Sequence, residues 1–338
     1  MNFDLATVLP VLWFFIIGFA VLMYVLLDGF VLGIGILSPF ADDEHQRDQM
    51  MNTAAPIWDG NETWLILGIA GLYSAFPRAY ALILSTLYLP ALLMMIGLVF
   101  RGVAFEFRFK AHKTRWVWGL GFHLGSLAVA FAQGVFLGAL VEGMPLETGK
   151  YLGGAFGWFS PFAVMTGCAL VFGYGLLGAT WLFMKTDGRT QRIAADLARP
   201  LMMVVIAFML MVSVWAPFIN AQVMQRWFTW PNLLYLAPVP LLTALVAGLL
   251  WRAVLTDREV QSFRWAMTLF VLGFIGLAVG IWPDIVPPHL TIWQAASPVA
   301  SQGFTLVGAL LMIPVVLGYT VYSYRVFRGK VRAGEGYH

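Results

Sequence analysis

Long apolar segments follow one another along most of the chain. A helix needs about 20 mainly apolar residues to span the hydrocarbon core of a bilayer, and nine segments approach or exceed this length. Their ranges are 8–37, 53–76, 79–105, 116–141, 157–184, 199–219, 232–252, 263–282 and 303–325. The pattern predicts an all-α integral membrane protein with about nine transmembrane helices, in which residues 1–338 form a single polytopic domain.

The composition agrees with a membrane location and excludes several classes of function. Hydrophobic residues make up 60% of the 338 positions, charged residues only 11%, and the mean hydropathy is +0.81. Soluble domains carry about 25% charged residues, so a soluble enzyme is excluded. The net charge of +3 reflects the loops, and we expect no nucleic-acid partner. Cys168 is the only cysteine, which excludes disulfides and CxxC metal motifs.

The basic residues are distributed unevenly between the two sets of loops. If the nine spans alternate in direction, all but three of the 20 Lys and Arg residues lie on one side. The exceptions are Arg78, Lys150 and Arg226. Cytoplasmic loops are enriched in Lys and Arg, so we expect the N-terminus outside the cytoplasm and the C-terminus inside it.

Three carboxylates interrupt the apolar segments. Asp28 lies inside the first span near its cytoplasmic end, and Asp59 and Glu62 lie near the cytoplasmic start of the second. An acid at the bilayer centre costs at least about 2.5–3.5 kcal/mol on insertion scales, so each is a functional candidate. A helix that begins at Asn52 would place Asp59 roughly 10 Å inside the membrane. Because Asp59 and Glu62 are three residues apart, they share one helical face, and the three acids are candidates for a proton-uptake path.

The polar residues of the spans leave several interpretations open. As an alternative, each acid would form a helix-to-helix hydrogen bond in a purely structural scaffold. A proton-coupled secondary transporter would also have buried acids, with broken helices in two matching repeats; Asp28-Gly29 is the only candidate break. Arg101 would snorkel and pair with Glu106, neutralise Asp59 or hold a quinone carbonyl. Gln133 would either bridge helices or line a polar path.

The histidines argue against haem in this chain. Of the five, only His123 lies clearly within a span. A bis-histidine haem in a helical bundle needs two axial ligands that face each other at similar depth. We therefore expect His123 to pack against a neighbouring helix, and we expect no copper or zinc site.

Six blocks of sequence, spread from the first span to the last, combine polar residues with small and aromatic ones. They are Leu27-Asp28-Gly29-Phe30, Trp58-Asp59-Gly60-Asn61-Glu62, Phe76-Pro77, Arg101-Gly102 through Arg108, Gly173 through Thr180, and Tyr324 through Lys330. In content, order and spacing they resemble subunit II of the cytochrome bd ubiquinol oxidases, including the cyanide-insensitive branch. The block that begins at Trp58 is the most specific. Val31 stands where many members have a second Asp.

The resemblance implies a haem-free subunit of a quinol oxidase that reduces dioxygen in the bacterial cytoplasmic (inner) membrane. It implies two four-helix bundles plus a peripheral helix, a partner subunit I that carries haem b and haem d, and in some members a small single-span accessory subunit. By the same resemblance, Asp28, Asp59 and Glu62 would line a cytoplasmic proton path. Trp58, Asp59 and Arg101 would contact a structural ubiquinone. No catalytic residue and no metal ligand is implied for this chain.

Overall fold

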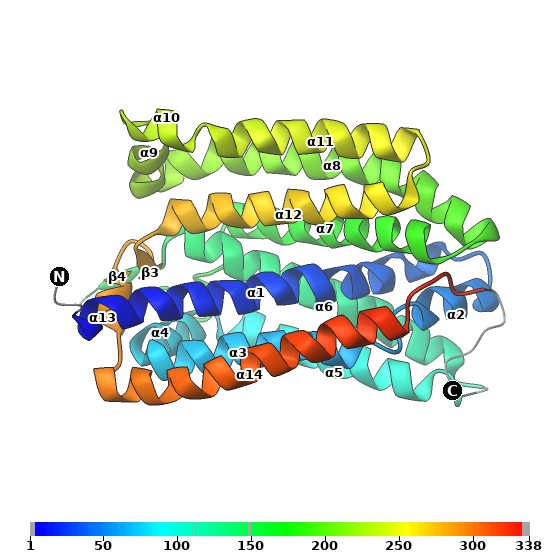
Figure 1. Cartoon of the computed structure of the whole chain (residues 1–338), viewed down its shortest axis with the longest axis horizontal. Coiled ribbons are helices and arrows are strands. Elements are labelled where there is room, and N and C mark those ends of the chain that lie inside the picture. Colours follow the sequence, from blue (N-terminus) through cyan, green and yellow to red (C-terminus); the bar gives the residue numbers. More distant parts are fainter. Residues whose placement is uncertain (1–3, 112, 148–149, 333–338) are drawn as a thin grey trace.

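The computed structural model in Figure 1 is a bundle of long helices that run roughly parallel or antiparallel to one another. It describes residues 4–111, 113–147 and 150–332. Eight helices in these ranges are long and apolar enough to cross a bilayer, and one bent pair of helices supplies a ninth candidate. The predicted all-α membrane fold is confirmed. The first helix begins at one end of the bundle and the last ends at the other (Figure 1), as an odd number of crossings requires.

The N-terminal half contains six helices and one 3-10 turn. They are α1 (Leu5–Leu37), η1 (Ser38–Phe40), α2 (Glu44–Asn52), α3 (Trp58–Ala75), α4 (Pro77–Thr86), α5 (Tyr88–Phe107) and α6 (Arg115–Glu142). The C-terminal half contributes α7 (Pro161–Lys185), α8 (Gly188–Ile219), α9 (Ala221–Phe228), α10 (Asn232–Leu236), α11 (Pro238–Leu255), α12 (Glu259–Ile281), α13 (Ile292–Ala295) and α14 (Val299–Val326). Two short antiparallel hairpins, β1 (Leu146–Glu147) with β2 (Lys150–Tyr151) and β3 (Asp284–Val286) with β4 (Leu290–Thr291), join helices at one end.

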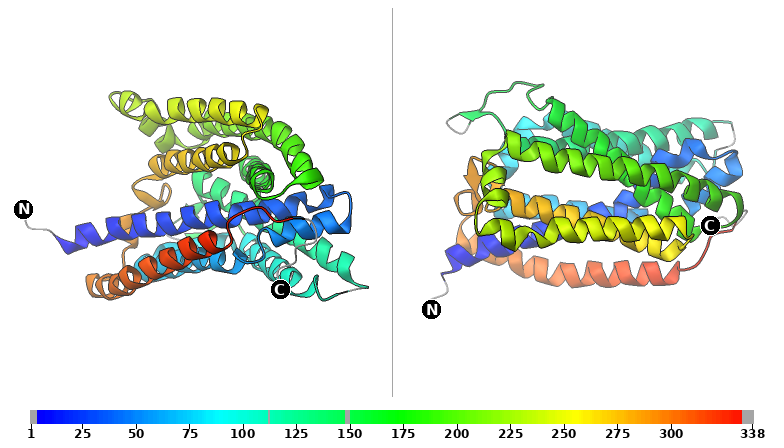
Figure 2. Two further views of the ribbon diagram at one scale, coloured as in Figure 1. Left: turned by 45° about the vertical axis from the view of Figure 1, so that its right-hand side comes forward. Right: turned by 90° about the horizontal axis from the view of Figure 1, so that it is seen from above.

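Two groups of four long helices and one outer helix make up the membrane part. The first group is α1, α3, α5 and α6, the second is α7, α8, α11 and α12, and α14 packs on α1 and α3. Figure 2 shows α14 on one flank and α11 on the opposite flank, with α1 between them. The arrangement is that of two four-helix bundles with a peripheral helix, and α1 and α6 join the bundles through their contacts with α7.

The two bundles approach most closely where α1 crosses α7. A Cβ atom added to Gly33 would lie 1.9 Å from the carbonyl oxygen of Tyr174, and one added to Gly178 would lie 2.4 Å from the Gly33 backbone. Small residues allow helix backbones in membranes to come this close. The glycines of these helices therefore set the depth to which the two bundles interlock.

Gly33→Ala is expected to destabilise the protein because the new methyl group has no space at this crossing. Overpacking of this kind costs about 1–3 kcal/mol, and the thermal unfolding midpoint in detergent measures it. Gly248→Ala is the matched control, since a Cβ at Gly248 in α11 would have nothing within 4 Å. An equal change in the midpoint for both variants would contradict the packing argument.

Three helices begin at positions that differ from the sequence-based expectation. The second span begins at Trp58 and not at residue 53, because residues 53–57 form turns that include Pro56. The expected third span, 79–105, is interrupted: α3 and α4 meet at a bend of 118°, and α5 begins only at Tyr88. Pro77 starts α4 and lacks the N–H that would continue the hydrogen bonding of α3.

The helix α8 begins at Gly188, although the sixth span was expected to begin only at residue 199. Thr190, Ala194 and Ala198 are buried on one face of this extension. The spacing of four residues between them is that of a helical stripe, and this stripe packs towards α2. Hydropathy locates only the apolar part of such a helix, so the charged first turns were missed.

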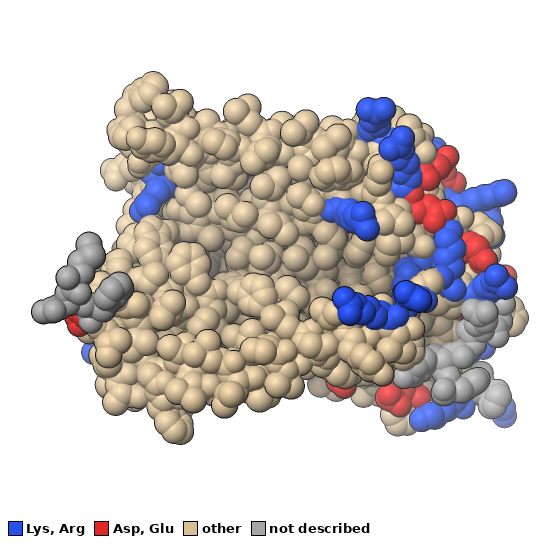
Figure 3. All heavy atoms as spheres, in the orientation of Figure 1, with Lys and Arg blue, Asp and Glu red and all other residues tan. Residues whose placement is uncertain are grey.

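The charged side chains gather at one end of the molecule (Figure 3), the end where α2 lies and where α14 terminates. Between this end and the opposite one, most of the surface in the same view consists of residues other than Lys, Arg, Asp and Glu, drawn in tan. We refer to the charged end as the basic end, because most of the Lys and Arg residues lie there.

Candidate functional site

A buried ion triad near the basic end joins three helices. Arg101 of α5 donates from Nη1 to Oδ1 of Asp28 in α1 at 2.7 Å, and from Nη2 to Oε1 of Glu62 in α3. The Arg101 and Asp28 side chains are fully buried, whereas the Glu62 side chain is 25% exposed. Two carboxylates share one guanidinium, so the ionised triad carries a formal charge of −1. Burial of an uncompensated charge is unfavourable, and uptake of one proton would make the triad neutral.

Close helix contacts hold the members of the triad in place. Arg101 lies one turn after Gly97, where a Cβ would be 2.8 Å from the carbonyl oxygen of Gly125 in α6. Asn61, next to Glu62, donates to the carbonyl oxygen of Leu27 at 2.8 Å and accepts from the Tyr324 hydroxyl at 3.2 Å. These contacts fix α3 against α1 and α14 beside Asp28. The positions of all three triad residues are therefore fixed by contacts between the helices that carry them and their neighbours.

The first turn of α3 places Trp58 and Asp59 at the edge of this site. The Trp58 ring stacks on Phe105 with ring centroids 5.1 Å apart, and Cζ of Arg101 lies 6.0 Å from the Trp58 ring centroid. Asp59 is exposed, and within the described residues its side chain makes no hydrogen bond or ion pair. Because α3 begins at Trp58, Asp59 does not lie 10 Å inside a helix as the sequence led us to expect.

The partners of Arg101 also differ from the interpretations drawn from the sequence. Arg101 neutralises Asp28 and Glu62, and neither Asp59 nor Glu106 pairs with it. Glu106 is exposed and lies 3.7 Å from Lys110. The acids thus become more buried in order from Asp59 through Glu62 to Asp28, which forms a graded series from the surface into the bundle.

A second set of polar side chains continues from Asp28 towards α7. The Tyr174 hydroxyl donates to Oε1 of Gln133 at 2.6 Å, and Nε2 of Gln133 donates to the Tyr24 hydroxyl at 2.9 Å. Tyr24 and Asp28 are four residues apart and therefore lie on one face of α1. Gln133 bridges helices, one of the two roles considered for it. Tyr24 and Tyr174 were missed, although the spacing of Tyr24 from Asp28 was visible in the sequence.

A separate charge cluster anchors α2 at the basic end. Nη2 of the fully buried Arg108 lies 2.5 Å from Oε2 of Glu44 and 3.2 Å from Oδ1 of Asp48. Arg47 also binds Glu44, and Arg115 contacts both acids. Desolvation acts to raise the pKa of Glu44, but the hydrogen bond from Arg108 and the positive charges of the three arginines outweigh it, so this pKa lies below its ordinary value of 4.5.

This lowered pKa predicts an acid-sensitive attachment of α2. A carboxyl group whose folded-state pKa is depressed stabilises the protein above its unfolded pKa, and this stabilisation is lost as the pH falls through the folded pKa. Glu44→Gln should therefore lower the thermal unfolding midpoint above pH 4.5 and have little effect well below it. Melting curves of both proteins across this range measure the effect, and parallel pH profiles would contradict it.

A comparison with known protein families identifies the chain. Residues 9–327 match the family described as cytochrome bd terminal oxidase subunit II. The chain belongs to this family. The resemblance found from the sequence blocks is thereby confirmed, and the chain is a multi-pass membrane protein of the subunit II type.

Relatives of this subunit II cover nearly the whole chain. It is 26% identical to cytochrome bd-I ubiquinol oxidase subunit 2 of Escherichia coli strain K12, over 96% of this chain and 95% of that protein. It is 29% identical to cytochrome bd ubiquinol oxidase subunit 2 of Bacillus subtilis strain 168, over 96% of this chain and 97% of that protein. The structure of bd oxidase from Geobacillus thermodenitrificans has the same fold, with a TM-score of 0.80 at 17% identity over 95% of this chain and 98% of that one.

Two histidines of this subunit II contact backbone carbonyl oxygens of neighbouring segments. Nδ1 of His123 lies 3.0 Å from the carbonyl oxygen of Gly35, and Nε2 of His289 lies 2.9 Å from that of Met144. In the described part of the chain, no group of three or more His, Cys, Asp or Glu residues could hold a metal ion. Family membership is what implies that the haems of the complex reside on the partner subunit.

Proposed function

We propose that this chain is the haem-free second subunit of a complex that oxidises quinol and reduces dioxygen, in the bacterial cytoplasmic membrane. Membership of the subunit II family over residues 9–327 carries the proposal and favours it over a secondary transporter. Relatives that are named ubiquinol oxidase subunit 2 support subunit I as the partner and quinol and dioxygen as the substrates. In this proposal haem b and haem d reside on subunit I, and a small single-span accessory subunit joins the complex.

The orientation follows from the basic end. Because cytoplasmic loops are enriched in Lys and Arg, the basic end would face the cytoplasm, with the N-terminus on the outer side and the C-terminus inside. The graded acids would then open to the cytoplasm. Protons consumed in water formation would be drawn from that side, so charge would move across the membrane without a pump.

The residues have separate roles in the proposed proton path. Asp59, exposed at the start of α3, would collect protons at the surface. Glu62 is partly exposed and contacts Arg101, so it would pass a proton on to Asp28. Asp28 shares Arg101 with Glu62 and would hold the proton at the deepest acidic position. The formal charge of −1 on the ionised triad supports this role, because it favours uptake of a single proton.

A structural ubiquinone would bind at the first turn of α3. Cζ of Arg101 lies 6.0 Å from the Trp58 ring centroid, so the cation and the indole that the quinone would contact are neighbours. Trp58 is half-buried and Asp59 exposed, which leaves their outer edges open to the headgroup. The quinone would brace α3 against α5, and we assign it no redox step in this chain.

Trp58→Leu is expected to remove this quinone from the complex, because the ring that would stack on the headgroup is lost. Solvent extraction of the purified complex followed by mass spectrometry measures the quinone content. Trp116→Leu is the matched control, since Trp116 is 67% exposed at the start of α6. Unchanged quinone content in the Trp58 variant would contradict the proposed site.

The proposed function as a whole is tested by purification through a tag on this chain. We expect a haem-bearing partner to co-purify, the complex to show haem absorption bands, and quinol to drive its oxygen consumption. Purification of a haem-free chain without a partner, from membranes that contain quinol oxidase activity, would contradict the proposal.

A further inference from the structure

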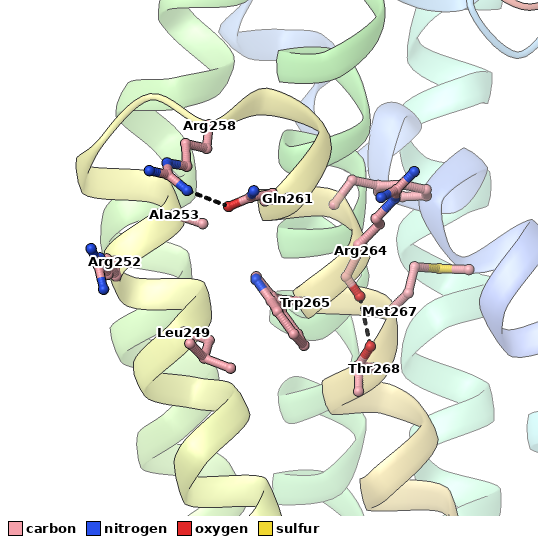
Figure 4. A pocket seen from close by; sticks show the side chains of 10 residues that line it. Leu249, Arg252, Ala253, Arg258, Gln261, Arg264, Trp265, Met267 and Thr268 are labelled. Atoms are coloured by element: carbon pink, nitrogen blue, oxygen red, sulfur yellow. Dashed lines mark hydrogen bonds between the residues drawn. The ribbon is translucent and has the colours of Figure 1, made fainter.

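A cavity of about 710 Å³ opens between α11 and α12 at the basic end. Figure 4 shows Arg252 and Arg258 on the α11 side, Arg264 on the α12 side and Trp265 between the two helices. Leu249 lies below the arginines, further from the charged end. The cavity therefore has a cationic rim and a largely apolar wall.

The three arginines of the rim form no ion pair within the described residues. Arg258 donates to Oε1 of Gln261 at 3.2 Å, which is a neutral partner. The acids in the neighbouring turn have other cations beside them: Asp257 lies 3.9 Å from Arg199, and Glu259 lies 2.7 Å from Lys330. The rim thus carries positive charge with which no acid in the described ranges pairs.

We propose that this cavity binds an anionic phospholipid of the leaflet at the basic end. Arginine pairs with phosphate through two parallel hydrogen bonds, and basic pockets between transmembrane helices recognise anionic headgroups. The phosphate would lie among Arg252, Arg258 and Arg264, and an acyl chain would pass Trp265 and Leu249. An indole at this depth suits the boundary between headgroup and hydrocarbon.

The shape of the site favours a lipid over a free phosphate. A soluble anion would contact only the rim, and the apolar wall formed by Leu249, Trp265 and Met267 would gain nothing from it. A phospholipid buries this wall and pairs with the rim at the same time. The arginines stand on both sides of the cavity (Figure 4), so a headgroup with two phosphates would contact more of them than a headgroup with one.

Native mass spectrometry of the purified complex, recorded as detergent exchange removes weakly bound lipid, tests the proposal. We expect phosphatidylglycerol and cardiolipin to remain bound where phosphatidylethanolamine dissociates. Replacement of all three rim arginines by Gln should weaken binding of the anionic lipids by about 100-fold, since each basic residue near anionic headgroups contributes roughly a factor of five. The lipid selectivity of the unmodified complex requires no variant and tests the proposal even if the triple variant fails to assemble.

The matched control replaces Arg192, Arg325 and Arg328 by Gln. These arginines are also exposed at the basic end and form no ion pair in the described ranges, but they do not line the cavity. The control should retain anionic lipid. If both triple variants lost anionic lipid to the same extent, general surface charge would explain the binding, and the proposal would be overturned. Displacement of the lipid by millimolar inorganic phosphate, or equal binding of phosphatidylethanolamine, would overturn it as well.

Discussion

Arg101→Met is expected to abolish or severely reduce assembly of the complex. The substitution leaves Asp28 and Glu62 without their shared cation in a site where Asp28 is fully buried. Removal of one partner from a buried ion pair costs about 3–5 kcal/mol, which is a large part of the stability of a typical domain. The amount of assembled complex in membranes and its thermal unfolding midpoint measure the loss.

Two further variants separate charge from geometry at this position. Arg101→Lys keeps the positive charge but replaces the planar fork by a single ammonium group, so we expect an intermediate stability. Arg199→Met removes an exposed arginine whose acids lie 3.8 and 3.9 Å away, and exposed pairs contribute about 0–1 kcal/mol. Normal yield and midpoint for Arg101→Met would show that the triad does not stabilise the subunit.

Glu62→Gln and Asp28→Asn are expected to slow dioxygen reduction while the haem-bearing complex still assembles. Each amide can still accept a hydrogen bond from Arg101 but can no longer carry a proton, so the change affects proton transfer more than packing. Loss of a proton-transfer group typically costs about 10²–10⁴-fold in rate, and we expect at least about a tenfold fall. Quinol-driven oxygen consumption per haem measures it.

Asp59→Asn should have a smaller effect than the two triad variants. Asp59 is exposed, and water can deliver protons to Glu62 in its absence. Glu106→Gln is the matched control, because Glu106 is also an exposed acid at the basic end but pairs with Lys110 outside the triad. Normal turnover of an assembled Glu62→Gln complex would refute the proton path. Failure of assembly in all of the acid variants would favour a purely structural role for the acids.

The fold and the candidate acids were accessible from the sequence because their signals are local. A run of apolar residues reports a span directly, and a carboxylate within such a run is conspicuous without knowledge of its neighbours. Asp28 and Glu62 were both found in this way. The short helix α4 was missed, because the residues after Phe76-Pro77 were interpreted as the start of a full span that continues to residue 105.

The pairing within the site was not accessible from the sequence, because it depends on how each helix is rotated about its axis. The sequence offered Asp59 and Glu106 as partners of Arg101 within the chain. The packing of α5 against α1 and α3 selects Asp28 and Glu62 instead. Gln133 was ambiguous for the same reason. Its contacts with Tyr24 and Tyr174 join residues of three helices that no spacing rule connects.

Time-resolved proton uptake by the purified complex in liposomes, with a pH-sensitive dye on the side of the basic end, tests the proton path most directly. We expect the unmodified complex to take up protons from that side in step with dioxygen reduction. Glu62→Gln should slow uptake and dioxygen reduction by the same factor. Uptake from the opposite side, or uptake at the normal rate in an assembled Glu62→Gln complex, would contradict the role assigned to Asp28, Glu62 and Arg101.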